Sequence, residues 1–237
     1  MHALATLVCR LVTALVWAWL GCTGLAQAAT YTADASAINA SVYPWIDISA
    51  TGTTISLSDD AVSSSINIGF TFTFGATGYT SVKVMSNGML QFATTSVDPT
   101  NAALPLDGTS SKPNIDAVMI PLWDDLMPDA GDVRYLSQGT APNRIFTVLW
   151  NAAPYSRKRA LKATFQVQLH ESGLFVFRYG AVDGSGGIHS LTGGLSNPNG
   201  ATVGVELSNT DYVQYSRNTA SVASGTTLVW TRVPGTP

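Results

Sequence analysis

Apolar and polar residues alternate along much of the chain, a pattern typical of β-strands that present one face to a core. The clearest case is 66–74, which reads Ile-Asn-Ile-Gly-Phe-Thr-Phe-Thr-Phe and places every second residue on one apolar face. Residues 164–169 alternate in the same way, whereas 174–179 form a nearly continuous apolar run that predicts a strand buried on both faces. Further strands are predicted at 79–85, 89–92, 117–123, 132–136, 144–150, 201–207, 212–215 and 226–231.

Turn residues separate these strands. Ser86-Asn87-Gly88 predicts a type I′ hairpin turn, because Asn and Gly both accept the left-handed conformation. Glu171-Ser172-Gly173 predicts a second hairpin turn, with Gly173 at positive φ. After residue 28 no segment shows a sustained helical period. Short strands and tight turns predict an all-β fold, a single antiparallel β-sandwich (jelly-roll-like) over residues 29–237.

The first 28 residues predict a cleaved signal peptide. The apolar run 11–20 is followed by Ala26-Gln27-Ala28, the pattern of small residues that signal peptidase requires. We therefore expect an exported chain that begins at Ala29 and is extracellular or at the cell surface. Two alternatives remain open at this point: an uncleaved anchor over 11–29, and a lipid anchor on Cys22.

The amino-acid composition argues against several classes of function. The two cysteines, Cys9 and Cys22, lie in the predicted signal peptide, so the mature chain can form neither a disulfide nor a cysteine-based catalytic or zinc site. Charged residues make up 11% of the chain and the net charge is −3, which argues against nucleic acid as a partner. After cleavage no membrane span is expected.

A series of short motifs spread along the chain resembles a known module. It includes Trp45-Ile46-Asp47-Ile48, Gly69-Phe70-Thr71-Phe72, Ser86-Asn87-Gly88 and Pro121-Leu122-Trp123-Asp124-Asp125-Leu126. Together these resemble the nidogen-like β-sandwich modules of bacterial surface and pilus-associated proteins, including mannose-sensitive haemagglutinin biogenesis proteins. The resemblance runs from Trp45 to Trp230 and implies a role in surface adhesion or assembly.

An acidic cluster follows the predicted strand 117–123. Its members, which we take as candidate metal ligands, are Asp124, Asp125, Asp129 and Asp132. Several carboxylates close together can supply the oxygen ligands that calcium prefers. The alternative is that these aspartates cap turns by accepting backbone N–H bonds. No other cofactor is expected.

Aromatic residues provide the second set of candidates. Four tryptophans lie within or beside apolar strand patterns, which favours core packing: Trp45, Trp123, Trp150 and Trp230. Three tyrosines lie nearer to turns and are the predicted ligand-binding residues: Tyr155, Tyr212 and Tyr215.

Catalytic residues are not predicted. His170 and His189 lie in turn-like or loop settings, and the two glutamates, Glu171 and Glu206, have no evident partner for acid–base chemistry. We therefore expect a non-catalytic surface module for adhesion, recognition or pilus assembly, with an extracellular protein or a glycan as partner. One alternative is a calcium-dependent, lectin-like carbohydrate-binding module, and a second is a hydrolase with an aspartate-based site.

Overall fold

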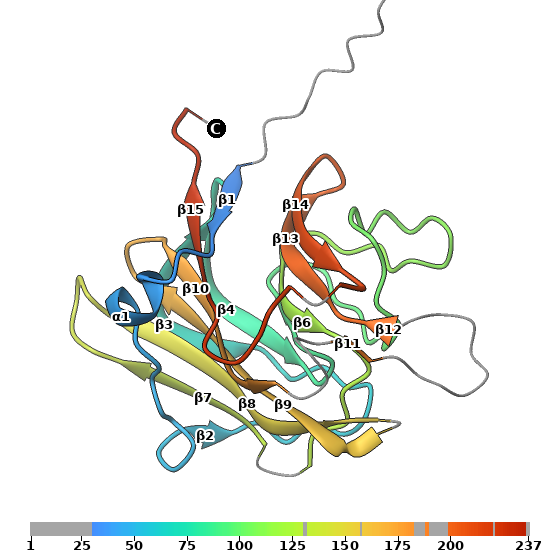
Figure 1. Ribbon diagram of the computed structural model, residues 1–237. Helices are drawn as coiled ribbons and strands as arrows, with labels where there is room; N and C mark the ends of the chain where they lie inside the picture. The colour runs from blue at the N-terminus through green and yellow to red at the C-terminus, as the bar shows by residue number, and fades with distance from the viewer. Residues whose placement is uncertain are drawn as a thin grey trace, which may run out of the picture.

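The chain folds as an antiparallel β-sandwich, which confirms the predicted fold class (Figure 1). The computed structural model describes residues 30–129, 132–156, 158–182, 188–189, 199–219 and 221–235. The predicted signal peptide lies outside these residues. Two sheets pack face to face, and almost every predicted strand is present within a few residues of its expected bounds.

The first sheet has seven strands. In spatial order they are β1 (Tyr31–Asp34), β15 (Thr227–Arg232), β10 (Phe175–Val182), β9 (Lys158–His170), β8 (Ile145–Tyr155), β7 (Val133–Gln138) and β2 (Thr53–Thr54). The strands β7 to β10 follow one another in both sequence and space, so this part of the sheet is a meander.

The second sheet has six strands. In spatial order they are β14 (Asp211–Arg217), β13 (Thr202–Ser208), β6 (Val118–Trp123), β5 (Met89–Gln91), β4 (Thr77–Met85) and β3 (Ile66–Phe74). Outside the two sheets, β11 (Ile188–His189) pairs with β12 (Asn199–Gly200), and α1 (Asn39–Val42) is a single helical turn.

The main core lies between the two sheets. Strand β3 shows the predicted alternation, with its apolar residues buried and its polar residues exposed. Opposite it, Trp150 and Trp230 are fully buried, and Trp150 stacks on Phe165 with ring centroids 4.8 Å apart. Period-two patterning therefore identified both the strands and the faces that form this core.

The β4–β5 turn corrects one prediction. Gly88 has φ +81°, but Asn87 is not at positive φ, so the turn is not of type I′. The Gly88 N–H donates to the Met85 carbonyl at 3.2 Å, and Met85 pairs with Met89, which makes a three-residue loop with Gly88 in the left-handed position. The predicted turn at Gly173, with φ +91°, is confirmed.

The outer face of the seven-stranded sheet is covered by residues 35–52, which we call the N-terminal cover. Two buried glutamines on β9 hold it: Gln166 exchanges two hydrogen bonds of 3.2 Å with the backbone of Ile46, and Gln168 donates to the Pro44 carbonyl at 2.9 Å. Figure 1 shows this segment in blue, running from α1 to β2 along one side of the sandwich.

The outer face of the six-stranded sheet is covered by residues 92–117, which we call the central cover. It contains no strand of its own, and it packs on a second apolar cluster, separate from the main core. The cover contributes Leu104, Leu106 and Ile115; the sheet and its β4–β5 hairpin contribute Met85, Met89, Val118, Ile120 and Trp123. This segment without strands is therefore a packed layer.

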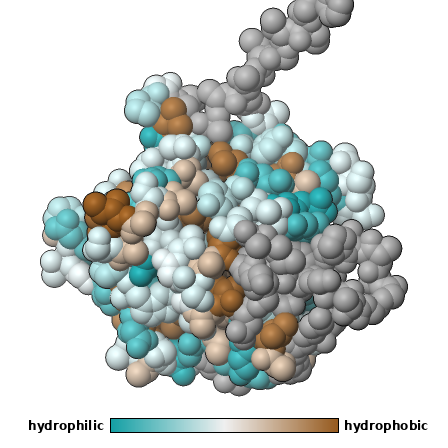
Figure 2. All heavy atoms as spheres, viewed as in Figure 1, coloured by the Kyte–Doolittle hydropathy of each residue, from teal (hydrophilic) through white to brown (hydrophobic). Residues whose placement is uncertain are grey.

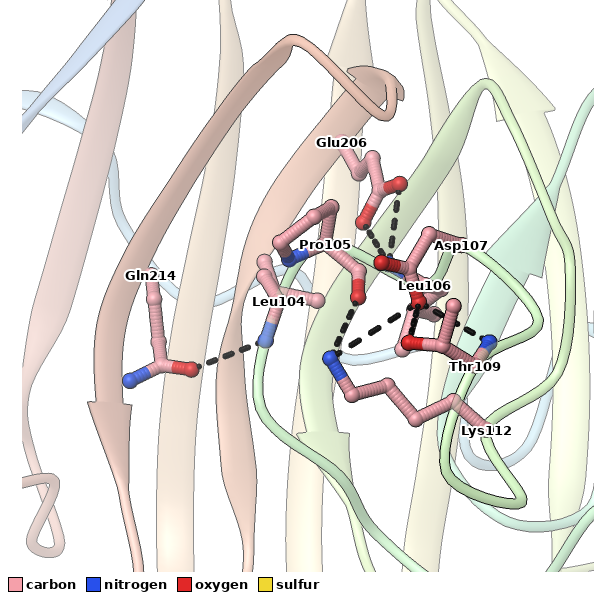
Figure 3. Close-up of polar contacts among 8 residues, drawn as sticks. All are labelled: Leu104, Pro105, Leu106, Asp107, Thr109, Lys112, Glu206 and Gln214. Carbon is pink, nitrogen blue, oxygen red and sulfur yellow. Dashed lines mark hydrogen bonds and ion pairs between the residues drawn. The ribbon is translucent and has the colours of Figure 1, made fainter. Parts of the chain in front are cut away.

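Side chains of β13 and β14 hold the central cover at its backbone (Figure 3). Gln214 of β14 accepts a hydrogen bond from the Leu104 N–H at 3.0 Å. Glu206 of β13 accepts the Leu106 N–H with both carboxylate oxygens, at 3.0 and 2.8 Å. Both covers are thus held by polar side chains of an outer face that bind the backbone of a crossing segment; Gln166, Gln168 and Glu206 are buried, whereas Gln214 is exposed.

The surface in this view is mainly hydrophilic, with small separate apolar areas (Figure 2). One such area lies where Figure 1 places α1; Ile38, which directly precedes α1, and Val42, its last residue, are 68% and 57% exposed. Among the described residues, no helix has the length and apolar character needed to cross a membrane.

Candidate functional site

The four predicted metal ligands after β6 do not converge on one point. Asp124 is 4% exposed; its Oδ1 accepts the Asp125 N–H at 2.8 Å, and its buried Oδ2 has no hydrogen-bond partner in the described ranges of the chain. Burial raises the pKa of Asp124 to about 7, and the neighbouring Asp125 carboxylate adds to the shift. Asp132 accepts the Asp129 N–H at 2.8 Å, so this pair caps a turn, as the alternative interpretation predicts.

A different acidic group forms when distant parts of the chain meet. Within the described part of the chain, Asp125 lies with Asp59 and Asp60, and one carboxylate oxygen from each falls within 4.8 Å of the others. The buried side chain of Asn87 connects the two segments, because it donates to Asp60 at 2.8 Å and accepts the Leu126 N–H at 2.8 Å. The acidic trio of Asp59, Asp60 and Asp125 can offer three oxygen ligands to a cation such as calcium.

The predicted tyrosines do not form one binding platform. Tyr155 is only 3% exposed, because β8 extends to this residue and carries it into the core, so the prediction of an exposed side chain is wrong here. Tyr212 on β14 is 37% exposed. Tyr215 on the same strand is half-buried and packs against the main core. Only Tyr212 therefore presents an accessible aromatic ring of the kind expected.

A polar groove lies between the edge strands of the two sheets. It has a volume of about 390 Å³, and its lining comes from β2, the start of β3, the connection between them and Tyr135 of β7. The lining is rich in hydroxyl groups and contains no Asp, Glu, Lys, Arg or His; its residues are Thr53, Thr54, Ile55, Ser56, Ser63, Ser64, Ser65, Ile66, Asn67 and Tyr135. Such a groove can donate and accept hydrogen bonds to a neutral polar ligand, but it holds no carboxylate or imidazole for proton transfer.

The sequence gives only a partial signal for this groove. Serine and threonine recur through 53–65, which is typical of a loop. What turns them into a groove is that β2 and β3 are the edges of different sheets and lie opposite each other. The topology of the two sheets brings these edges opposite each other, and the local composition of 53–65 could not reveal that arrangement.

Buried ionisable groups are the usual markers of catalysis, and here they are dispersed. Burial raises the pKa of Glu206 to about 7, and the carboxylates of Asp116 and Asp107 add to the shift. Glu206 pairs with Val118 at the start of β6, whereas Asp124 follows the end of β6. At about 3.3 Å per residue, six residues separate these carboxyl groups by roughly 20 Å, much more than the ~5–10 Å of a glycosidase pair.

His170 contacts the N-terminal cover, with its ring 5.6 Å from the ring of Tyr43. Burial lowers its pKa, and among the described residues its Nε2 has no hydrogen-bond partner. The side chain of His189 lies outside the described residues.

Comparison with known proteins gives one match. The model of the NIDO related family matches residues 30–234, which is nearly the whole of the sandwich. Neither the comparison with curated proteins nor the comparison with solved structures found a match. The matched region includes both sheets, both covers, the polar groove and the acidic trio. The chain therefore belongs to the nidogen-related family.

Proposed function

We propose that this domain is an exported, non-catalytic recognition module that binds an extracellular protein or a glycan. The polar groove between β2 and β3 is the observation that carries the proposal. It offers hydroxyl, amide and edge-strand backbone groups without a carboxyl, imidazole or amine group, which suits binding better than turnover. A nidogen-related domain is an extracellular type of module, and the signal peptide predicted at 1–28 agrees with export.

Neutral, hydroxyl-rich ligands suit this groove best. The lining residues carry no charge to attract an ionic ligand, and their hydroxyl groups can each donate and accept a hydrogen bond. The same chemistry fits the hydroxyl groups of a glycan chain or the backbone of an extended peptide. Adhesion and pilus or surface assembly are the biological settings that the resemblance to pilus-associated proteins favours.

A glycan array, together with an array of extracellular matrix and pilus proteins, tests the proposal on the purified mature domain. Ser64→Tyr places a large ring in the groove, and we expect it to weaken binding to any captured ligand by at least about tenfold, or 1.4 kcal/mol. Ser58→Tyr is the matched control, because Ser58 is exposed in the same connection but does not line the groove. Equal loss in both variants, or no ligand on either array, would contradict the proposal.

A substrate screen tests the proposal that the domain has no catalytic activity. Peptidase, esterase and glycosidase substrates should show no turnover with pure protein. Turnover that Asp124→Asn abolishes would instead support the aspartate-based hydrolase alternative.

A calcium-dependent, lectin-like function is the second candidate, because the acidic trio brings three carboxylates within reach of one ion. Calcium takes 6–8 oxygen ligands, so backbone groups or water would have to complete the coordination shell.

If calcium binds, removing it with EDTA should lower the melting temperature. Calcium at about one hundred times its dissociation constant should restore roughly 2.7 kcal/mol of stability. Asp60→Asn should abolish this response, whereas Asp132→Asn should leave it unchanged. No response to EDTA or calcium in the unmodified domain would exclude this candidate.

A further inference from the structure

Glu206 occupies an unusual position for a charged residue. It lies in the middle of β13, paired with Val118 of β6 on one side and Tyr212 of β14 on the other, and its side chain is 0% exposed. The central cover lies over it and seals it from solvent. Buried carboxylates normally have a cation or several donors as partners, because an isolated charge in a dry site is strongly unfavourable.

The surroundings of Glu206 do not compensate its charge. Within the described part of the chain, its carboxyl group accepts hydrogen bonds from one donor, the Leu106 N–H, which both oxygens share (Figure 3). Two ion pairs occur among the described residues, and neither includes Glu206. The central cover contributes three nearby charged groups, of which Asp107 and Asp116 oppose ionisation and Lys112 favours it. No ionisable residue of β6 acts on Glu206, and the β14 neighbour in register is Tyr212.

Lys112 is directed to other partners. Its ammonium group donates to the Pro105 carbonyl at 3.0 Å and lies 3.8 Å from the Asp107 carboxylate (Figure 3). The cation therefore holds the cover together internally. An ionised Glu206 gains a stronger bond from the Leu106 N–H, but it remains desolvated and without a paired cation.

The central cover has few other means of attachment at this point. Outside this stretch the Ala117 N–H donates to the Leu207 carbonyl of β13 at 3.3 Å, and Thr202 donates to the Ala102 carbonyl at 2.7 Å. Between Leu104 and Ile115, the described residues show no backbone–backbone hydrogen bond to the sheet, and the cover is held there by Gln214, by Glu206 and by apolar contacts. A change at Glu206 therefore acts directly on the contact between the cover and the sheet.

We propose that Glu206 is a pH-sensitive switch that keeps the central cover closed on β13 when its carboxyl group is protonated and loosens the cover when it is ionised. Loosening exposes the second apolar cluster beneath Leu104 and Leu106, and so makes an apolar sheet face available at neutral or alkaline pH. This inference concerns the opposite side of the sandwich from the N-terminal cover and does not depend on the function of the polar groove.

The direction of the pH effect follows from the folded and unfolded pKa values. The pKa of Glu206 is raised from 4.5 to about 7 in the folded protein. Below pH 4.5 the group is protonated in both states, and the closed cover has its full stability. As the pH rises from 4.5 to 7, only the open or unfolded state ionises, so stability falls. The contribution of Glu206 to the folding equilibrium constant should decrease by roughly 300-fold in total, between a pH well below 4.5 and a pH well above 7.

A carbon-detected NMR titration of the Glu206 carboxyl in the whole domain tests the switch directly. We expect a midpoint near pH 7, and a midpoint between 4 and 5 would overturn the proposal. The second test compares the pH dependence of folding stability in the unmodified domain and in Glu206→Gln, whose amide stays neutral and can still accept from Leu106. Asp124, the other carboxyl with a pKa of about 7, is present in both proteins, so its contribution cancels.

We expect the stability of the unmodified domain relative to Glu206→Gln to fall as the pH rises from 5 to 8. Parallel pH profiles for the two proteins would overturn the proposal. If Glu206→Gln does not fold, the carboxyl titration alone decides the question, because it uses only the unmodified chain.

Discussion

The two outer faces of the sandwich are covered in the same way but with different chemistry. On the seven-stranded sheet, the amides of Gln166 and Gln168 bind the N-terminal cover, and an amide both donates and accepts. On the six-stranded sheet, Gln214 is joined by the carboxylate of Glu206, which only accepts while it is ionised. One cover is therefore held by groups that do not titrate, and the other depends partly on a group that does.

This difference shows how little an extended outer segment needs in order to become part of a fold. Two polar side chains, at alternate positions of β9 on one face and on the neighbouring strands β13 and β14 on the other, bind the backbone of the crossing segment. The choice between glutamine and glutamate at such a position then decides whether the attachment responds to pH. Both faces remain packed, but only the six-stranded side carries a second apolar cluster beneath its cover.

Removing the largest side chain under the central cover should have the largest effect. Trp123 is fully buried in the second apolar cluster, and its indole N–H donates to the Asp98 carbonyl of the cover at 2.9 Å. Trp123→Ala should destabilise the domain by about 3–5 kcal/mol, because it leaves a cavity and an unpaired carbonyl. The loss is measured by denaturant unfolding.

The control for this change is Trp45→Ala in the N-terminal cover, where the indole is half-buried against Gly180. Trp45→Ala should lower the free energy of unfolding by clearly less than Trp123→Ala does. A Trp123→Ala variant as stable as the unmodified domain would show that the central cover is not packed as described.

Transferring the carboxyl group to the other cover should transfer the pH dependence. In Gln166→Glu, a protonated carboxyl can still donate to the Ile46 carbonyl, but an ionised one cannot. We expect this variant to lose about 1–3 kcal/mol more stability than the unmodified domain between pH 5 and pH 8. Gln166→Leu is the control, since it should weaken the cover equally at both pH values. Identical pH profiles for Gln166→Glu and the unmodified domain would contradict the comparison.

The sequence predicts the strands and the inward faces well, because alternation is a local property. Strand β3 has the predicted bounds, and Trp150 and Trp230 lie in the core as expected. The same alternation assigns Gln166, Gln168 and Glu206 to the outward faces, where polar residues normally meet solvent. Their burial results from segments more than 80 residues away in the chain, and no local pattern reports it.

Prediction of the candidate sites is limited in the same way, because local sequence does not report contacts between distant segments. The aspartates at 124, 125, 129 and 132 are neighbours in sequence, but the carboxylate of Asp132 accepts the Asp129 backbone N–H, and Asp125 lies with Asp59 and Asp60. Tyr155 lies next to a turn, as the last residue of β8, yet its side chain is buried in the core and not available to a ligand. Long-range pairing, which a single sequence does not reveal, decides both outcomes.

Amide hydrogen exchange at Leu106 and Ile46 in one sample tests most directly whether the two covers differ in their response to pH. Each N–H donates to a side chain of its own sheet, Leu106 to Glu206 and Ile46 to Gln166. After correction for intrinsic rates, protection at Leu106 should fall by roughly 10- to 100-fold from pH 5 to pH 8. Protection at Ile46 should stay the same or change much less. Equal changes at the two amides, or none at Leu106, would contradict the account.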